Sequence, residues 1–159
     1  MPRLEILPEK QRIMMENYPC PEFEDTPWKP LLKPLSQSRV ALVSTAGLHL
    51  RGDRPFATAR GGDTSYREIP SDCSPSDIIQ SHTSIGFDRT TSFRDINISF
   101  PIDRLKELKD NHQIGSLSKN YYSFMGALSD VSNLIEESGP EVAIKLLQDE
   151  VDVVLLVPT

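Results

Sequence analysis

Runs of apolar residues along the chain predict strands that alternate with helices. Val40 to Thr45 (VALVST) is followed by Ala46-Gly47, the pattern of a buried parallel strand that runs into a loop. Val151 to Val157 (VDVVLLV) is apolar on both faces and predicts a strand covered on both sides. Between these two runs, residues 77–85 (DIIQSHTSI) form a weaker strand candidate and residues 121–125 (YYSFM) a further short element.

Other segments show amphipathic spacing. Asp95 to Phe100 (DINISF) alternates strictly, which predicts a strand with one polar face. Helices are predicted from about Pro8 to Asn17 and from Pro101 to Asp110, each with apolar residues on one side. A third helix is predicted up to about Gln148, beginning at the residues Ser138-Gly139-Pro140-Glu141, which match a capping box with proline in the first turn.

Strands alternating with helices predict an α/β fold. We expect a mainly parallel sheet with flanking helices, of the Rossmann-like or flavodoxin-like kind. Five prolines between Pro19 and Pro34 exclude regular structure there. We therefore divide the chain into an N-terminal helix with a proline-rich arm (1–35) and an α/β domain (36–159). The arm either packs along the body or a partner subunit, or is a disordered leader.

The domain is expected to be incomplete at its C-terminal end. A crossover helix that covers one face normally follows a buried parallel strand, but Val151 to Val157 is followed only by Pro158-Thr159. We expect either that the natural reading frame continues or that another chain covers this face.

Composition narrows the class of protein. The 159 residues carry a net charge of −6 without a basic tract, so binding to a nucleic-acid backbone is not expected. No apolar stretch reaches the roughly 20 residues that span a bilayer, and the start lacks a secretion signal, so we expect a soluble cytoplasmic protein. Cys20 and Cys73 are too far apart in sequence for a redox pair or a zinc site and are expected to be plain thiols, although a redox role for either stays open.

Arginine is concentrated in the middle of the chain. Residues 34–105 contain eight arginines and no lysine, together with eight acidic residues. Internal arginine–carboxylate pairs would explain this bias. Alternatively, one or two arginines, above all Arg51, Arg54 or Arg89, bind a small carboxylate substrate or orient a partner subunit.

One histidine follows the first predicted strand, and another lies near the end of the second. His49 lies in HLRGDRP and His82 in SHTSIGFDR, so both can reach one crevice at the strand ends and serve in proton transfer. A structural role for each remains the alternative. A metal site would need carboxylates such as Asp53 or Asp88 and is not expected. His112, in the polar segment after a helix, is expected to be exposed.

Several segments in order carry a resemblance to a known family. They are VALVSTAGLHLRGDRPF (40–56), GGDTSYREIPSD (61–72), SHTSIGFDR (81–89), DINISFPIDRLKEL (95–108), IGSL (114–117) and YSFMG (122–126). Together they resemble the selenoprotein B family, which comprises the B subunits of glycine, sarcosine and betaine reductases and the D-proline reductase selenoprotein. The resemblance covers about residues 35–159.

The resemblance implies reductive cleavage of a C–N bond in a small amino acid or betaine. In this family a selenocysteine or cysteine, with a second thiol nearby, follows the strand that corresponds to Val151 to Val157. A thiolate or selenolate at such a strand-to-helix turn is stabilised by backbone N–H groups. The family also implies a pyruvoyl group on a separate partner subunit, and hence an oligomer. Selenocysteine is encoded by UGA, so a sequence read only to Thr159 would result if that codon were taken as a stop.

We therefore predict a subunit or fragment of a selenoprotein B type reductase, without a cofactor in these 159 residues and inactive alone. His49 and His82 are the candidate catalytic residues, and the candidate substrate-binding residues are Arg51, Asp53, Arg54, Asp88 and Arg89. These assignments rest on position in strand-end loops. The alternatives are a non-catalytic protein that binds small zwitterions and a scaffold that pairs through its last strand.

Overall fold

The computed structural model describes residues 3–18, 22, 24–57, 62–82, 84, 87 and 89–159, with only the backbone described at positions 89 and 91. The chain divides into two compact units, Met1–Pro30 and Leu31–Thr159. The first contains a 3-10 turn, Leu4–Ile6, and helix α1, Glu9–Glu16. The helix predicted from Pro8 to Asn17 is thus confirmed, while the domain boundary after residue 35 stays a prediction.

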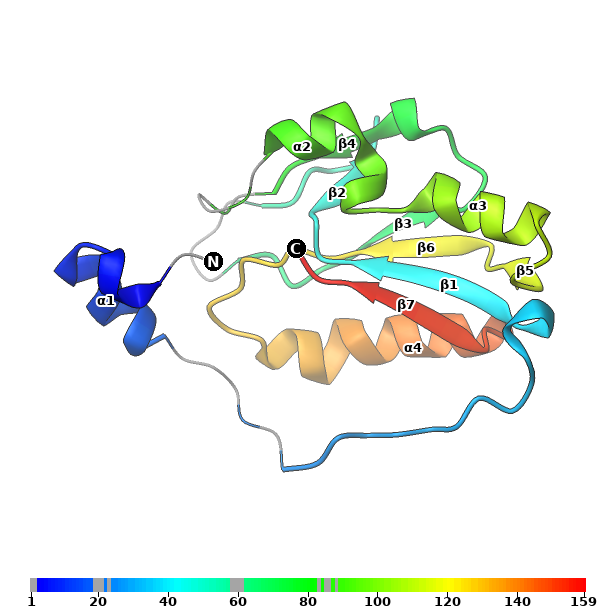
Figure 1. Ribbon diagram of the computed structural model, residues 1–159, viewed down its shortest axis with the longest axis horizontal. Coiled ribbons are helices and arrows are strands. Elements are labelled where there is room, and N and C mark those ends of the chain that lie inside the picture. The colour runs from blue at the N-terminus through cyan, green and yellow to red at the C-terminus, as the bar shows by residue number, and fades with distance from the viewer. Residues whose placement is uncertain are drawn as a thin grey trace. The chain divides into compact units, whose positions relative to one another are not determined.

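The second unit is built on one sheet and a separate strand pair (Figure 1). β1 is the central strand, with β7 along one edge and β5 and β6 in succession along the other, and β3 pairs with β6. β2 and β4 form a pair of their own. The strands are β1 Arg39–Ser44, β2 Leu48–Leu50, β3 Arg67–Pro70, β4 Ile78–Gln80, β5 Ser116–Leu117, β6 Asn120–Ser123 and β7 Val153–Val157.

The prediction of an α/β fold is confirmed, but a mainly parallel sheet of the Rossmann-like kind is not, because the strands pair in both directions. β1 is parallel to β5, β6 and β7. β3 is antiparallel to β6, and β2 is antiparallel to β4. The two antiparallel pairings involve strands of three or four residues, whose direction local patterns do not reveal.

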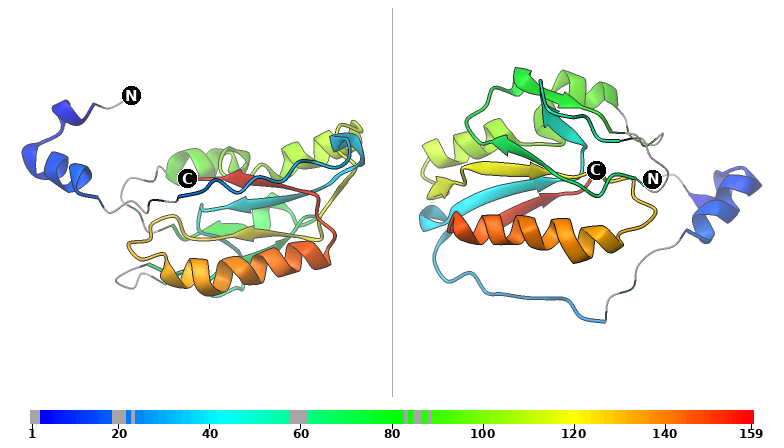
Figure 2. Two further views of the ribbon diagram at one scale, coloured as in Figure 1. Left: turned by 90° about the horizontal axis from the view of Figure 1, so that it is seen from below. Right: turned by 180° about the vertical axis from the view of Figure 1, so that it is seen from behind.

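Helices cover both faces of the sheet, as Figures 1 and 2 show. On one face, Ile102 and Leu105 of α3 join the main core with Val40 and Leu42 of β1. On the other face, Val142 of α4 packs with Tyr122 and Phe124 in a smaller core. The helices are α2 Arg89–Arg94, α3 Ile102–Asp110 and α4 Gly139–Gln148, with 3-10 turns at Leu35–Gln37, Pro75–Asp77 and Ile96–Ile98.

Strand β7 differs from its prediction in one respect. The strand exists, but it is not covered on both sides, because the side chains of Leu155 and Leu156 on its opposite faces are 40% and 68% exposed. In the described parts of the chain β7 pairs only with β1 and is therefore an edge strand. An all-apolar strand at an open edge is unusual, because such edges invite pairing with another chain.

The strand predicted from Asp95 to Phe100 is wrong. Residues Ile96–Ile98 form a 3-10 turn, because the Asp95 side chain accepts a hydrogen bond from the Asn97 amide at 2.9 Å. Asn97 in turn bonds Asp103 through both its side-chain oxygen and nitrogen. These local side-chain bonds compete with strand pairing and close a turn instead.

The capping box at Ser138 is also wrong. A π-helical turn, Leu134–Ser138, leads directly into α4, so Ser138 has helical backbone angles and its side chain does not cap the helix. The Ser138 hydroxyl instead donates to the Thr64 carbonyl at 2.6 Å. This contact joins the start of α4 to the segment before β3.

Two aspartates join the amino-terminal ends of the parallel strands. Asp149, after α4, accepts a hydrogen bond from Arg39 Nη1 at 3.1 Å and one from the Lys119 amide at 2.7 Å. Asp152 accepts from the Arg39 amide at 2.7 Å and pairs with Lys33 Nζ at 2.8 Å. The starts of β1, β6 and β7 are therefore held by one group of charged residues, which we call the Asp149–Asp152 anchor.

Candidate functional site

The parallel strands β1, β6 and β7 end at the same edge of the sheet, which is where ligands bind in open α/β sheets. Thr45, after β1, is bonded to the residues at the end of β7: its amide donates to the Val157 carbonyl at 3.2 Å, and its hydroxyl accepts from the Thr159 amide at 2.9 Å. Residue 159 is thus held beside the end of the central strand.

The backbone after β6 passes close to this point. A β-carbon at Gly126 would lie 2.7 Å from the Thr159 carbonyl oxygen and 3.1 Å from the Thr45 hydroxyl. Contacts under about 3 Å are too close for a carbon atom, so a side chain here would push the strand ends apart. Gly126 is therefore a packing requirement of the site.

His82 reaches the same edge from the segment after β4. Its backbone lies against Gly47, where the chain leaves β1 with a φ of 65° and a β-carbon would come within 3.1 Å of His82. A pocket of about 250 Å³ is lined by His82, Ser84, Phe87, Gly126, Ala127 and Thr159, and we call it the His82 pocket. Sequence analysis predicted His82 from its place near the end of a strand, and the structure puts it beside residue 159.

The orientation of the His82 ring is fixed by its neighbours. The ring stacks on Phe87 with the centroids 4.4 Å apart, and Nδ1 accepts a hydrogen bond from the Ser84 amide at 3.1 Å. A neutral ring whose Nδ1 accepts carries its proton on Nε2. In this form His82 can therefore donate a hydrogen bond from Nε2, and the pocket around it is lined mainly by small and apolar residues.

His49 occupies a different place. It lies on β2, is only 4% exposed, and does not line the His82 pocket. Its Nδ1 is 2.8 Å from the Leu50 carbonyl and so donates to it, which leaves the buried Nε2 without a hydrogen-bond partner among the described residues. The structure does not bring His49 and His82 together in one pocket.

Arg51 and Asp53 form the turn after β2. The Asp53 carboxylate accepts from the Leu50 amide at 3.1 Å, and the Arg51 amide donates to the Asp77 carbonyl at 3.0 Å. Both side chains are exposed. Asp88 lies outside the described residues, and for Arg89, the first residue of α2, only the backbone is described. Their predicted roles in substrate binding stay predictions.

Arg54 lines a larger polar pocket of about 540 Å³ together with Gly62, Asp63, Ser65 and Arg67, and we call it the Arg54 pocket. Arg67 holds one wall in place. Its Nε donates to the Arg54 carbonyl at 2.8 Å, its guanidinium lies 4.3 Å from the centre of the Phe56 ring, and it is 3.7 Å from the Asp63 carboxylate.

Burial tends to raise the pKa of Asp63, but hydrogen bonds from the Ala57 amide and from Ser65, with the charge of Arg67, lower the pKa overall. Sequence analysis included Arg67 and Asp63 in the charged stretch without singling them out. Their spacing of four residues was the available signal.

One residue from the wall of each pocket lies close to the other. Gly62 lines the Arg54 pocket and Ala127 lines the His82 pocket. A β-carbon at Gly62, which has a φ of 94°, would lie 2.8 Å from the Ala127 carbonyl oxygen. The walls of an arginine-lined pocket and of a histidine-lined pocket therefore approach each other at one backbone contact.

Ion pairs account for part of the arginine bias. Arg39 pairs with Asp149, Arg67 with Asp63 and Arg104 with Glu107. Among the residues that the structure describes, neither Arg51 nor Arg54 has an ion-pair partner. Internal pairing thus explains three of the arginines and leaves these two available for an external anion.

The described part of the chain gives little support for a reactive thiol or a metal site. Burial raises the pKa of the Cys73 thiol, which lowers its reactive thiolate fraction near neutral pH. Cys20 lies outside the described residues. Within the described ranges no group of three or more His, Cys, Asp or Glu side chains could hold a metal ion, and no helix is long and apolar enough to cross a membrane.

Residues 9–159 match the family model of glycine/sarcosine/betaine reductase selenoprotein B. The chain is 41% identical over 129 residues to the D-proline reductase subunit gamma of Acetoanaerobium sticklandii, which covers 81% of this chain and 52% of that protein. It is 30% identical over 144 residues to the sarcosine reductase complex component B subunit beta of Peptoclostridium acidaminophilum, covering 89% of this chain and 33% of that protein. The chain thus spans a third to a half of the length of these relatives. No solved structure matches it.

Proposed function

The chain belongs to the glycine/sarcosine/betaine reductase selenoprotein B family, and we propose that it is part of a reductase subunit that cleaves a C–N bond of a small amino acid or betaine. The observation that carries this proposal is the position of Thr159. It lies at the carboxyl end of a parallel strand, on the wall of a pocket that also contains a buried histidine.

In the proposed reaction a selenocysteine or cysteine just after Thr159, with a second thiol nearby, supplies two electrons. The C–N bond breaks, the amine nitrogen leaves with the bonding electrons and takes a proton, and the carbon gains hydrogen. The selenol and thiol are oxidised to a selenenyl sulfide, which an external dithiol such as dithiothreitol reduces. A pyruvoyl group on a partner subunit would activate the substrate. Neither the group nor the partner is contributed by these 159 residues.

We assign His82 the proton transfer to the leaving amine. The imidazolium form of histidine is the general acid that this step needs, and it would give up the proton on Nε2. We assign Arg54, in the other pocket, to the substrate carboxylate, since a guanidinium binds a carboxylate with two parallel hydrogen bonds. The two roles are assigned separately, each from the side chain that lines its own pocket.

The nucleotide sequence after the Thr159 codon is a direct test. A UGA or cysteine codon within the next few positions supports the proposal. A sense codon for another residue throughout that window, or an ordinary UAA or UAG stop, refutes the placement of the nucleophile.

Activity gives the second test. The complex that contains this chain and the proposed nucleophile segment should convert at least one of D-proline, glycine, sarcosine and betaine with dithiothreitol, measured by mass spectrometry of the products, whereas the 159 residues alone should convert none. His82→Asn should lower kcat by about 100-fold or more, in the range for loss of a general acid. His112→Asn is the matched control, because His112 is exposed and asparagine tolerates its φ of 57°.

The Arg54 pocket also favours a second candidate, a protein that binds small zwitterions without turnover. The pocket contains Arg54 and has a volume of about 540 Å³, and neither feature depends on a redox residue. Binding of these same compounds by the 159 residues, seen as a thermal shift that Arg54→Ala abolishes, would support it if the complex shows no turnover.

A further inference from the structure

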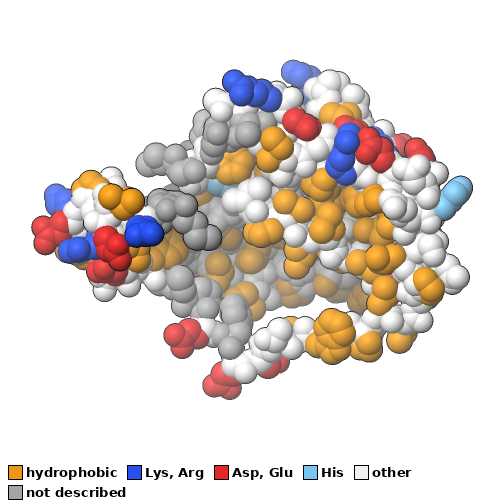
Figure 3. Space-filling model, viewed as in Figure 1, with side chains coloured by type: hydrophobic (Ala, Val, Ile, Leu, Met, Phe, Trp, Pro, Cys, Tyr) orange, Lys and Arg blue, Asp and Glu red, His pale blue; other side chains and the backbone are white. Residues whose placement is uncertain are grey.

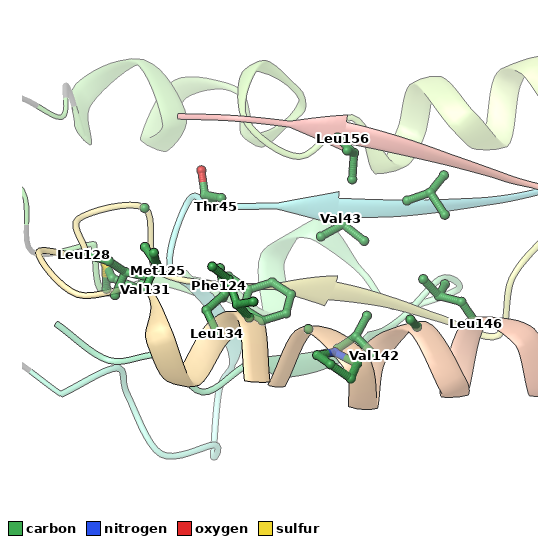
Figure 4. Close-up of a pocket in the computed structure, with 16 residues that line it drawn as sticks. Val43, Thr45, Phe124, Met125, Leu128, Val131, Leu134, Val142, Leu146 and Leu156 are labelled. Carbon is green, nitrogen blue, oxygen red and sulfur yellow. The ribbon is translucent and has the colours of Figure 1, made fainter. Parts of the chain in front are cut away.

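An apolar groove lies between helix α4 and the sheet (Figure 4). It shares Gly126 with the His82 pocket. The volume of the groove is about 600 Å³, and we call it the β7–α4 groove. The side chains that define it come from β1, the segment after β6, α4 and β7: Val43, Phe124, Val142, Leu146, Val154 and Leu156. In the close-up, Leu156 points from β7 toward the groove and Val43 lies beside it on β1.

The groove continues onto an exposed apolar surface. Leu156 on its sheet side, and Ile135 on the turn before α4, are 68% and 53% exposed, while Leu147 at the end of α4 is 71% exposed. Hydrophobic side chains also gather over β7 in the view of Figure 3. Exposed apolar side chains beside an apolar groove favour a site of protein contact.

The free edge of β7 offers a second feature for binding, namely backbone hydrogen-bonding groups. Within the described residues its one strand partner is β1, so the backbone groups along the other edge face outward. A partner that satisfies both features must offer an extended strand for the edge and apolar side chains for the groove. A small ligand would cover the groove and leave the edge open.

We infer that the β7–α4 groove and the free edge of β7 receive the part of a selenoprotein B subunit that this chain does not match. The length of the relatives identifies this occupant, since the chain covers 52% of the D-proline reductase subunit gamma and about as much polypeptide again remains. Within one protein that remainder is tethered to this region, and tethering gives a high effective concentration. The inference rests on the proposed function, in which the remainder carries the nucleophile.

This arrangement deepens the proposed function. β7 would become an inner strand, and the same remainder that covers it would bring its thiol or selenol to the His82 pocket at the end of β7. Binding of the remainder and completion of the site would then be one event. Covering β7 would also explain why a strand of five apolar residues stands at the sheet edge.

The test uses the full 159-residue chain, tagged and co-expressed with the unmatched remainder of the Acetoanaerobium sticklandii D-proline reductase subunit gamma. We expect a 1:1 complex by size-exclusion chromatography with light scattering. Leu156→Asp should weaken its affinity at least tenfold, measured by biolayer interferometry. Phe93→Asp is the matched control, because Phe93 of α2 is 76% exposed and lies outside the groove, and it should change the affinity less than twofold.

Hydrogen exchange on the unmodified chain provides a measurement that does not depend on a variant. Amides in residues 153–157 should gain protection in the complex. The inference is overturned if no complex forms, if β7 gains no protection, or if the two variants weaken binding equally. It is also overturned if the chain self-associates and Leu156→Asp abolishes only that, which would assign the groove to a second copy. A complex that forms with β7 protected but converts no substrate after the partner subunit with the pyruvoyl group is added refutes the proposed function and leaves the groove assignment intact.

Discussion

Asp149→Ala is expected to lower the free energy of unfolding by about 2 kcal/mol, because Asp149 joins two strand ends. One carboxylate oxygen accepts from Arg39 Nη1 at 3.1 Å and the other from the Lys119 amide at 2.7 Å. The Asp149 side chain is only 14% exposed. Hydrogen bonds that involve a charged group contribute about 1.5 kcal/mol each at the lower end of their range, or about 3 kcal/mol for two.

Two effects reduce this loss. The Arg39 side chain is 33% exposed, so water replaces part of its lost contact. Asp149 also follows the C-terminal end of α4, where a negative charge is unfavourable by about 0.5 kcal/mol, and alanine removes that cost. The net loss of about 2 kcal/mol corresponds to a fall in Tm of about 4–8 °C for a chain of this size.

Urea unfolding followed by circular dichroism measures the difference. Asp110→Ala serves as the control, because the Asp110 side chain is 74% exposed and its nearest ion-pair partner, Lys109, is 3.9 Å away. Exposed pairs of this kind contribute about 0–1 kcal/mol. If the two alanine variants unfold at the same urea concentration, the prediction is wrong. The buried hydrogen bonds of Asp149 would then contribute no more to stability than the exposed Asp110 pair does.

Three further outcomes follow from the surroundings of single residues. Tyr121→Phe should raise the free energy of unfolding by about 1 kcal/mol in the same urea assay, because the Tyr121 hydroxyl is buried without a hydrogen-bond partner among the described residues; a loss of stability would contradict this. Gly126→Ala should cost about 1–3 kcal/mol, since its β-carbon would lie 2.7 Å from the Thr159 carbonyl, and a neutral effect would show that the strand ends move freely. In a Cys20→Ser background, alkylation of Cys73 by iodoacetamide should have its pH midpoint above that of free cysteine, because burial raises the Cys73 pKa; a midpoint at or below that value would count against a plain buried thiol.

Local patterns predicted the elements whose apolar spacing is regular. The strand at Val40 and the helix beginning near Pro101 form as expected, with β1 at Arg39–Ser44 and α3 at Ile102–Asp110. The pattern failed where a side chain makes a hydrogen bond other than the one that the predicted element requires. Asp95 has the alternation of a strand but closes a turn on Asn97, and Ser138 bonds Thr64 across the fold instead of capping its own helix.

The sequence predicted only those residues of the candidate site that lie near the ends of predicted strands. His82 could be placed near the edge of the sheet because it lies near the end of a predicted strand, and the structure puts it in a pocket with Thr159. The separation of His49 from that pocket, and the close approach of Gly62 to Ala127, depend on the register of distant segments. Spacing along a chain carries no information about such contacts. Arg67 was missed as a wall of the Arg54 pocket for the same reason.

The Asp149–Asp152 anchor has a consequence for how proteins of this family diverge. The anchor holds the amino-terminal ends of the parallel strands, whereas both pockets form at the carboxyl ends. Mutations that reshape a pocket therefore leave the anchor in place, and changes in specificity need not be accompanied by compensating changes in stability. Such a division lets the side chains that line the pockets of this chain change while Asp149 keeps its bonds to Arg39 and Lys119.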